Sequence, residues 1–184
     1  MKDKGLSLRY FRHTHLHTGT TAEMRYAVEE FLSSHGYTVA PVTVAGHDWI
    51  FTQVYDKAKF EEDTNVIRYV GSVYVPYMEQ CLIFAEENSV TLFGHEIPQI
   101  LLLHLSSLNT DYLDQLLAMI KGRGYKFVNL STALANEAYL TRDDYIGPHG
   151  LSWLQRWAIT MGKELRGFPR EPDTLLRLYV EADI

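Results

Sequence analysis

Short apolar runs and longer stretches with helical spacing alternate along the chain. Residues 6–11 form an apolar and aromatic run, which predicts a strand. Thr20 and Glu23 then have the spacing of an N-terminal capping box, and the periodicity that follows predicts a helix that ends at Gly36. Residues 37–44 are rich in Val and Thr, which favours a second strand.

Helical periodicity continues through the middle of the chain. Residues 49–87 predict two helices with a break near 62–65, the second with a kink at Pro76. Residues 100–103 form a continuous aliphatic run, which is typical of a strand buried on both faces of a parallel sheet.

The C-terminal part continues the alternation. Its expected elements are, in order, a helix capped by Asn109 or Thr110, a strand at 125–130, a short helix at 131–135, a helix at 151–161, and a helical turn or docking strand after Glu171. Strands that alternate with helices predict right-handed parallel βαβ units, in a barrel or an open doubly wound α/β sheet. About four strands are expected, fewer than the roughly eight that close a packed barrel.

Composition limits the class of protein. The 184 residues, 46% of them hydrophobic, predict a single domain over 1–184 with a sizeable core. The net charge of −6 comes from scattered residues, so no basic stripe exists for nucleic acid. No apolar run approaches the ~20 residues of a membrane span, and no secretory signal follows Met1, so localisation stays open. Cys81 is alone, which excludes a disulfide within the chain.

Chemically active residues follow the predicted strands. Ligands of parallel α/β sheets bind at the carboxyl ends of the strands, so residues just after each strand are the candidates. These candidates are Arg12, His13, His15 and His17 after the first strand, His47, Asp48 and Trp49 after the second, His104 after the third, and Ser131 after the fourth. Arg, Asp and His at one edge would supply an orienting ion pair and a general acid or base.

Several of these residues lie in recognisable motifs. The motifs are Arg9 to Gly19, the strand from Gly36 to Val42, the Asp48-Trp49 pair, Ile97 to His104, Gly124 to Val128, and Tyr145 to Trp153. In order and spacing they resemble the later motifs of the polysaccharide deacetylase family, carbohydrate esterase family four. The resemblance runs through most of the chain.

The resemblance implies a fold and an activity. Members of the family form a distorted (β/α) barrel, so we expect an incomplete parallel-strand barrel here. They use a divalent metal, zinc or a similar ion, to remove acetyl groups from N-acetylated sugars of chitooligosaccharides, chitin-like polymers or peptidoglycan, or from acetylated xylan. The expected activity is therefore that of a metal-dependent carbohydrate deacetylase, a hydrolase of non-peptide carbon-nitrogen bonds.

By resemblance, three residues have catalytic roles. Arg12 would orient a catalytic carboxylate, and Asp48 would hold Arg12 or tune the general acid. His104 would protonate the leaving amine, a step that suits imidazole near neutral pH.

By the same resemblance, three residues bind the substrate. The backbone N–H of His15 would help stabilise the oxyanion. Trp49 would form a wall of the pocket, and Leu102 would receive the acetyl methyl group.

The chain also departs from the family pattern. The catalytic base and the metal ligands of the family precede the arginine motif, whereas only eleven residues precede Arg12. We therefore expect a truncated domain that lacks base and metal and hydrolyses little or nothing by itself. The Asp143-Asp144 pair lies in a polar segment and is expected to be solvated loop. Thr14, His15 and Ala45 replace the usual Pro, aromatic residue and Asp.

Some residues allow two interpretations. Residues 13–17 fit the metal-binding pattern His-Ser/Thr-x-x-His through His13 and His17, yet their flanks match the arginine motif, so they are metal ligands or ordinary polar loop residues. His104 could instead end a buried strand with its ring satisfied by a carbonyl. Asp48 and Trp49 could be a helix cap and a core aromatic.

Two further functions fit the same sequence. The chain could be a non-catalytic carbohydrate-binding or assembly subunit, whose open sheet edge pairs with a partner or a second copy. Exposed Leu6, Leu8 and Tyr10 would be the signature of that edge. It could also be a fragment of a longer enzyme.

Overall fold

The computed structural model describes residues 8–182, which form two compact units. Unit 1 comprises residues 8–43, 89–100 and 129–165. Unit 2 comprises residues 44–88, 101–128 and 166–182. The placement of the units relative to each other is not defined, so each is described by itself.

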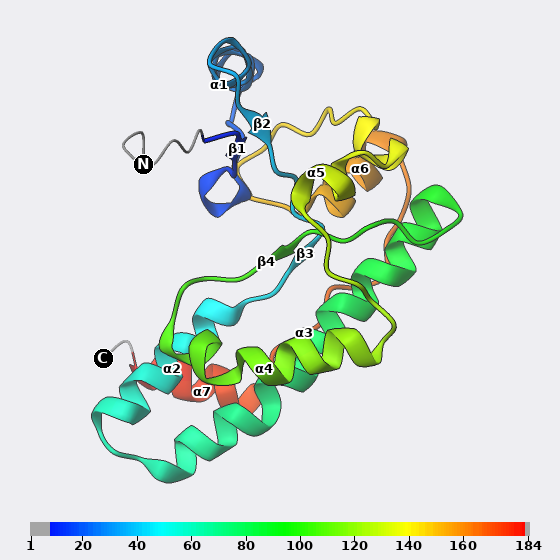
Figure 1. Ribbon diagram of the computed structural model, residues 1–184. Coiled ribbons are helices and arrows are strands. Elements are labelled where there is room, and N and C mark those ends of the chain that lie inside the picture. The colour runs from blue at the N-terminus through cyan, green and yellow to red at the C-terminus, as the bar shows by residue number, and fades with distance from the viewer. Residues whose placement is uncertain (1–7, 183–184) are drawn as a thin grey trace. The chain divides into compact units, whose positions relative to one another are not determined.

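Unit 1 combines a pair of short strands with helices. Its elements are β1 (Tyr10–Phe11), the 3-10 helix η2 (Thr14–Leu16), α1 (Ala22–Ser34), β2 (Thr38–Val39), α5 (Leu130–Leu134), the 3-10 helix η3 (Glu137–Leu140) and α6 (Trp153–Met161), drawn in Figure 1. β1 and β2 are parallel, with Tyr10 opposite Thr38. This parallel pair is connected by α1, as a βαβ unit requires.

Helix α6 supplies much of the core of unit 1. Ser152 and Gln155 form a capping box at its N-terminus, and Gly162 adopts a left-handed conformation with φ 63° at its C-terminus. Leu154 and Trp157 are buried on its inner face.

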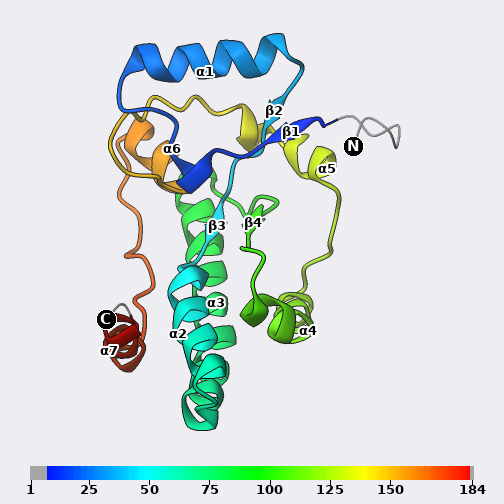
Figure 2. The ribbon, with the colours of Figure 1, turned by 90° about the vertical axis from the view of Figure 1, so that its left-hand side faces the viewer.

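Unit 2 is built mainly of helices. Its elements are β3 (Val44–Ala45), α2 (Asp48–Phe60), α3 (Thr64–Phe93, which also supplies residues 89–93 to unit 1), β4 (Leu101–Leu102), α4 (Ser107–Gly122) and α7 (Asp173–Ala182). β3 and β4 are parallel, with Val44 opposite Leu101. In Figure 2, β3 continues into α2 and β4 continues towards α4, so the two strands deliver the beginnings of two helices.

Local chemistry explains the helix boundaries of unit 2. The break between α2 and α3 lies at residues 61–63, as the sequence predicts. Glu62 has φ 57°, and the Asp63 carboxylate accepts hydrogen bonds from the backbone N–H groups of Asn65 and Val66. The side chain therefore satisfies donors that the start of α3 leaves unpaired.

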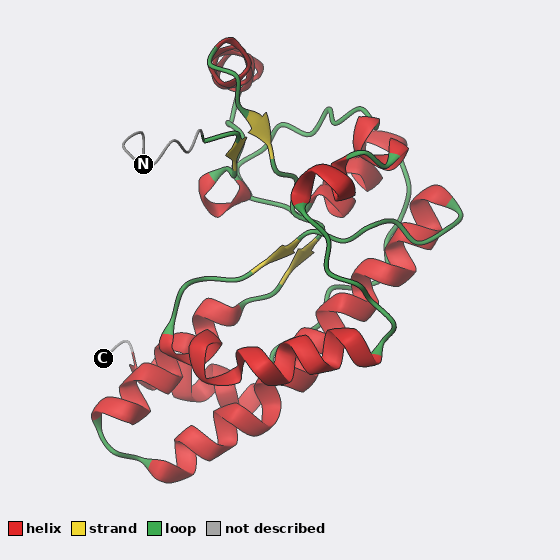
Figure 3. Cartoon of the chain, viewed as in Figure 1, coloured by secondary structure: helices red, strands yellow, loops and turns green. Residues whose placement is uncertain are grey.

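The expected barrel is wrong. Helices make up 59% of the described residues, and the four strands have two residues each and form two separate parallel pairs. Figure 3 shows these pairs in yellow among the helices. Two paired strands cannot wrap around a common core, which a barrel requires. Within residues 8–182 the fold is helical with two short parallel ladders.

The strand predicted at 125–130 is also wrong. Residues 125–129 have no regular structure, and Phe127 and Val128 are more than half exposed. The Asn129 side chain accepts a hydrogen bond from the backbone N–H of Thr132 and begins α5 one residue earlier than expected. An apolar run therefore does not form a strand unless a neighbouring strand pairs with it.

At the starts of two helices, the capping residue differs from the one that the sequence predicts. Thr21, rather than Thr20, accepts the hydrogen bond from Met24 at the start of α1. Ser106, rather than Asn109 or Thr110, caps α4. Gly36 has φ 74° after α1, as expected of a C-terminal glycine.

Among the described helices, none combines the length and hydrophobicity needed to cross a membrane.

Candidate acid-base site

A buried carboxylate lies at the start of α2. The chain leaves β3 at Ala45, passes Gly46 and His47, and places Asp48 as the first helical residue. The Asp48 side chain is fully buried. Because a helix N-terminus carries unpaired N–H groups and a partial positive charge, it is a favourable place for a buried carboxylate.

His104 contacts this carboxylate in two ways. Its ring atom Nδ1 lies 2.7 Å from Asp48 Oδ1, and its backbone N–H donates to Asp48 Oδ2 at 2.9 Å. The His104 side chain is 48% exposed, whereas the Asp48 side chain is 1% exposed. The site thus joins a buried, fixed carboxylate to an imidazole that solvent and ligands can reach, the arrangement needed for proton transfer at a surface.

Two further residues extend the hydrogen-bond chain into the core. The Asn109 amide Nδ2 donates to Asp48 Oδ2 and to the His104 backbone carbonyl, both at 2.8 Å. The Tyr74 hydroxyl donates to Asn109 Oδ1. Burial, followed by the charge of Asp48, raises the pKa of Tyr74, so its hydroxyl keeps its proton and remains a donor.

A second polar cluster lies beside the first in unit 2. His47 Nδ1 contacts Glu171 Oε1, and the Tyr77 hydroxyl donates to the same oxygen at 3.1 Å. The backbone N–H of His47 donates to the Tyr77 hydroxyl at 3.2 Å. Burial raises the pKa of the neighbouring Cys81 thiol to about 12, so this thiol stays protonated and is a poor nucleophile.

The structure brings together only some of the predicted residues. Asp48 and His104 pair, and Trp49 is 46% exposed, so its alternative interpretation as a core aromatic is wrong. Leu102 is buried at the end of β4, and its role as a receptor for the acetyl methyl group stays a prediction. Arg12 belongs to the other unit, so an Arg12-Asp48 pair also stays a prediction.

His15 lies in the 3-10 helix η2 of unit 1 with φ 53° and ψ 22°. This left-handed conformation is uncommon for a residue other than glycine. Its side chain is exposed, and the predicted role of its backbone N–H in binding an oxyanion stays a prediction.

The histidines at 13 and 17 do not suit a cation. His13 is 6% exposed, its ring packs against Phe11, and its pKa is lowered by burial and by the positive charge of Arg156. His17 Nδ1 accepts the backbone N–H of Gly19. A nearby guanidinium repels a divalent ion. Within residues 8–182, no group of three or more His, Cys, Asp or Glu side chains could hold a metal.

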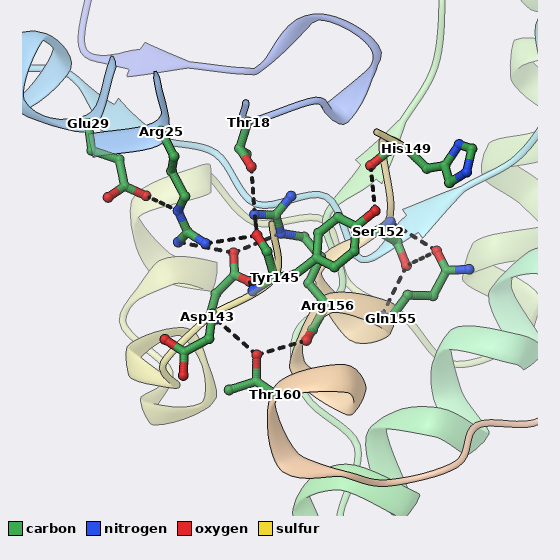
Figure 4. Close-up of polar contacts among 11 residues, drawn as sticks. Thr18, Arg25, Glu29, Asp143, Tyr145, His149, Ser152, Gln155, Arg156 and Thr160 are labelled. Carbon is green, nitrogen blue, oxygen red and sulfur yellow. Dashed lines mark hydrogen bonds and ion pairs between the residues drawn. The ribbon is translucent and has the colours of Figure 1, made fainter. Parts of the chain in front are cut away.

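The predicted solvated loop at Asp143 and Asp144 is half wrong. The Asp144 side chain is 47% exposed, but that of Asp143 is 10% exposed. Asp143 accepts from Nε of the fully buried Arg156 at 2.7 Å, and Arg156 also donates to Thr18 at 2.8 Å, as Figure 4 shows. Asp143 is buried because it pairs with the buried Arg156, thirteen residues later in the sequence.

The sequence alone did not point to Asn109, Tyr74 or Glu171. Asn109 was expected to be a helix cap, and Tyr74 was one of several aromatic residues in the α3 periodicity. The contact between Tyr74 and Asn109 spans 35 residues, and that between Asn109 and Asp48 spans 61. The polar type of Asn109, five residues after His104, was the one signal available.

No known protein family, no curated protein and no solved structure matches the chain.

Proposed function

We propose that the chain is a carbohydrate deacetylase-type hydrolase in which His104, oriented by Asp48, protonates the amine that leaves an N-acetylated sugar. The observation that carries the proposal is the hydrogen bond between Asp48 and His104. The sequence motifs around both residues add the substrate class. The described residues, 8–182, form no barrel and so add no support, and the proposal depends on the site and the motifs.

The chemistry assigned to His104 is a single proton transfer. As the carbon-nitrogen bond of the tetrahedral intermediate breaks, the electron pair moves to nitrogen, and the ring donates the proton that the nitrogen needs. Asp48 accepts from Nδ1, so Nε2 is the nitrogen that faces the substrate. The buried carboxylate also balances the charge of the doubly protonated ring.

The arrangement of the exposed residues agrees with a surface site for a sugar. Trp49 follows Asp48 directly, and its ring lies edge-on to Tyr179, with 5.7 Å between the ring centroids. Nearly half of the Trp49 side chain remains exposed. An exposed indole on the residue next to Asp48 in the sequence offers an apolar face against which a sugar ring can pack.

A metal is part of the family chemistry, but the described residues do not fit one. Burial lowers the pKa of His13, and so do the charges of Arg156 and Arg25, whereas the charge of Glu29 raises it by less than that of Arg156 lowers it. We therefore assign no step to a metal. The roles given to Asp48 and His104 require none.

The test is acetate release from an N-acetylated chitooligosaccharide such as tetra-N-acetylchitotetraose, with and without added zinc or cobalt. We expect weak turnover in the intact chain, lowered a further ~10²–10⁴-fold by His104→Gln, the usual contribution of a general acid. His95→Gln, at an exposed histidine, is the matched control. Turnover that survives His104→Gln unchanged would contradict the proposal.

Zinc-dependent turnover that disappears in a His13→Gln/His17→Gln double variant would assign a metal role to those residues and contradict our interpretation of them. Binding can be followed in parallel through the NMR signals of the His104 ring and the Trp49 indole. Sugar binding without acetate release would favour the non-catalytic carbohydrate-binding function.

A second candidate function, assembly of like or unlike subunits, is favoured by one observation in unit 1. Leu8 and Tyr10 on and beside β1 are 57% and 39% exposed, and Met24 and Phe31 on α1 are each 57% exposed. Leu6, the third residue of the predicted edge, lies outside the described residues. Light scattering over a concentration series tests this function, and a strictly monomeric chain would exclude self-association.

A further inference from the structure

We infer that Asn109 and Tyr74 are positioning residues of the acid-base site. Tyr74 orients the Asn109 amide, and that amide holds the Asp48 carboxylate in the orientation that fixes the His104 ring. The catalytic consequence rests on the proposed function, whereas the geometric consequence can be measured without any substrate.

Donor and acceptor types determine the orientation of the Asn109 amide. Its partners Asp48 Oδ2 and the His104 carbonyl oxygen can only accept, so the nitrogen of the amide must face them. The amide oxygen must then face Tyr74, whose hydroxyl has to donate. All three hydrogen bonds of the amide are therefore assigned without ambiguity, although an amide by itself can be placed either way round.

The same accounting fixes the His104 ring. Asp48 Oδ2 receives two donors, the His104 backbone N–H and the Asn109 amide, which leaves Oδ1 for the ring. A carboxylate has no proton to give, so the ring must present Nδ1–H to Oδ1. Nε2 is then the nitrogen left for a substrate. The Asn109 amide thus binds both partners of the acid-base pair, the Asp48 carboxylate and the His104 backbone.

Burial makes the chain of contacts rigid. Tyr74 and Asp48 have no exposed surface and Asn109 has 6%, so water cannot replace their hydrogen bonds. The backbone N–H of Asn109 donates to the Ser106 hydroxyl at 3.1 Å, which fixes Asn109 within the first turn of α4. The buried side chains of Tyr74, Asn109 and Asp48 form a hydrogen-bonded series that reaches the half-exposed His104 ring, as expected of a network that orients this ring.

The neighbours of Tyr74 explain why it cannot move away. Its ring packs against Phe51 and Tyr112, with centroids at 5.3 and 6.3 Å. Gly71 lets Tyr112 approach α3 closely, because a Cβ atom at Gly71 would lie 1.8 Å from the Tyr112 hydroxyl. Tyr74 is thus held by its neighbours with its hydroxyl on Asn109.

The experiment measures the tautomer of His104 in the full chain labelled with ¹⁵N-histidine, by long-range ¹⁵N–¹H NMR correlation at pH 8. His104→Gln identifies its signals among those of the eight histidines. In the wild-type chain we expect the Nδ1–H form to predominate. A predominant Nε2–H form would overturn the inference.

Asn109→Leu removes the amide at similar volume, and we expect it to raise the fraction of the Nε2–H form severalfold. Tyr74→Phe removes one oxygen and should shift the fraction in the same direction by less. Gln115→Leu, an exposed amide on the same helix, is the matched control and should leave the His104 signals unchanged.

An unchanged tautomer ratio in a folded Asn109→Leu chain would overturn the role of Asn109. If Asn109→Leu does not fold, Tyr74→Phe decides, and an unchanged ratio there would overturn the inference. The readout needs no sugar, so a failure of acetate release would reject the proposed function and leave the positioning network standing. In a chain that turns over, Asn109→Leu should lower kcat more than it changes KM.

Discussion

Asp48 and His104 are 56 residues apart in the sequence, and Oδ1 of the first lies 2.7 Å from Nδ1 of the second. The contact forms because β3 and β4 run parallel side by side, with Ala45 opposite Leu102. Asp48 follows one strand by three residues and His104 follows the other by two. The same carboxylate also accepts the backbone N–H of His104 and the amide of Asn109.

Replacing Asp48 with Ala should lower the free energy of unfolding by at least about 1–3 kcal/mol, because buried donors lose their acceptor. Urea denaturation followed by circular dichroism measures the change. Asp144→Ala, which removes a half-exposed carboxylate paired with Arg142, is the control and should change stability by no more than ~0.5 kcal/mol. Equal effects at the two positions would contradict the assigned role of Asp48.

Replacing Arg156 with Ala should be among the most damaging single changes in unit 1. Arg156 is fully buried, pairs with Asp143 and donates to Thr18. Asp143 keeps Arg25 at 3.4 Å when Arg156 is removed, so the expected cost is about 3 kcal/mol, at the lower end for breaking a buried pair. Arg142→Ala, at an ion pair whose arginine is 83% exposed, should cost less than about 1 kcal/mol. Thermal and urea unfolding of both variants provide the comparison.

His13 should make the chain less stable in mild acid. Its pKa is lowered by burial first and by the charge of Arg156 second, so the folded state binds the proton less readily than the unfolded chain. Its contribution is fully present above the unfolded pKa of about 6.5, and it is lost as pH falls from there through the lowered folded pKa. One proton gives a slope of at most about 1.4 kcal/mol per pH unit.

We therefore expect His13→Gln to flatten the loss of stability between pH 7 and pH 5. The measurement is the free energy of unfolding of both proteins at half-unit steps across that range. A parallel pH dependence in the two proteins would show that the His13 environment is not as the structure has it.

Replacing Gly150 with Ala should destabilise unit 1, because the new Cβ would lie 1.6 Å from the backbone oxygen of His15. Backbone has to move to relieve this contact, and such overpacking costs about 1–3 kcal/mol. Gly122→Ala at the end of α4 meets no atom within 4 Å and should instead stabilise by about 0.4–1 kcal/mol. Melting temperatures that shift in opposite directions from that of the wild-type chain would confirm the difference.

Periodicity was a good guide to helices and a poor one to strands. The break between α2 and α3 and the end of α1 just before Gly36 follow from local signals, namely a change of spacing and a glycine that accepts a left-handed φ. The run at 125–130 has the same composition as a buried strand, yet it remains irregular and largely exposed. A strand needs a partner, and the identity of a partner is not a local property.

The candidate site shows the same division. Asp48 and His104 could be named because each follows a predicted strand, and residues after parallel strands gather at one edge. Asn109 and Tyr74 could not be named, because their importance comes from what they touch. Asp143 was placed in solvent because nothing near it in the sequence reveals that Arg156 is buried thirteen residues later.

By itself the sequence determined the approximate positions of most of the α-helices, the charge balance and the chemical groups available at the ends of the predicted strands. These follow from spacing and side-chain type within a few residues. The tertiary structure decided that no barrel forms among residues 8–182, that Asp48 and His104 meet, and that Tyr74 and Asn109 hold them. Those outcomes depend on which buried polar groups find partners across 35 to 61 residues of chain, which only packing can determine.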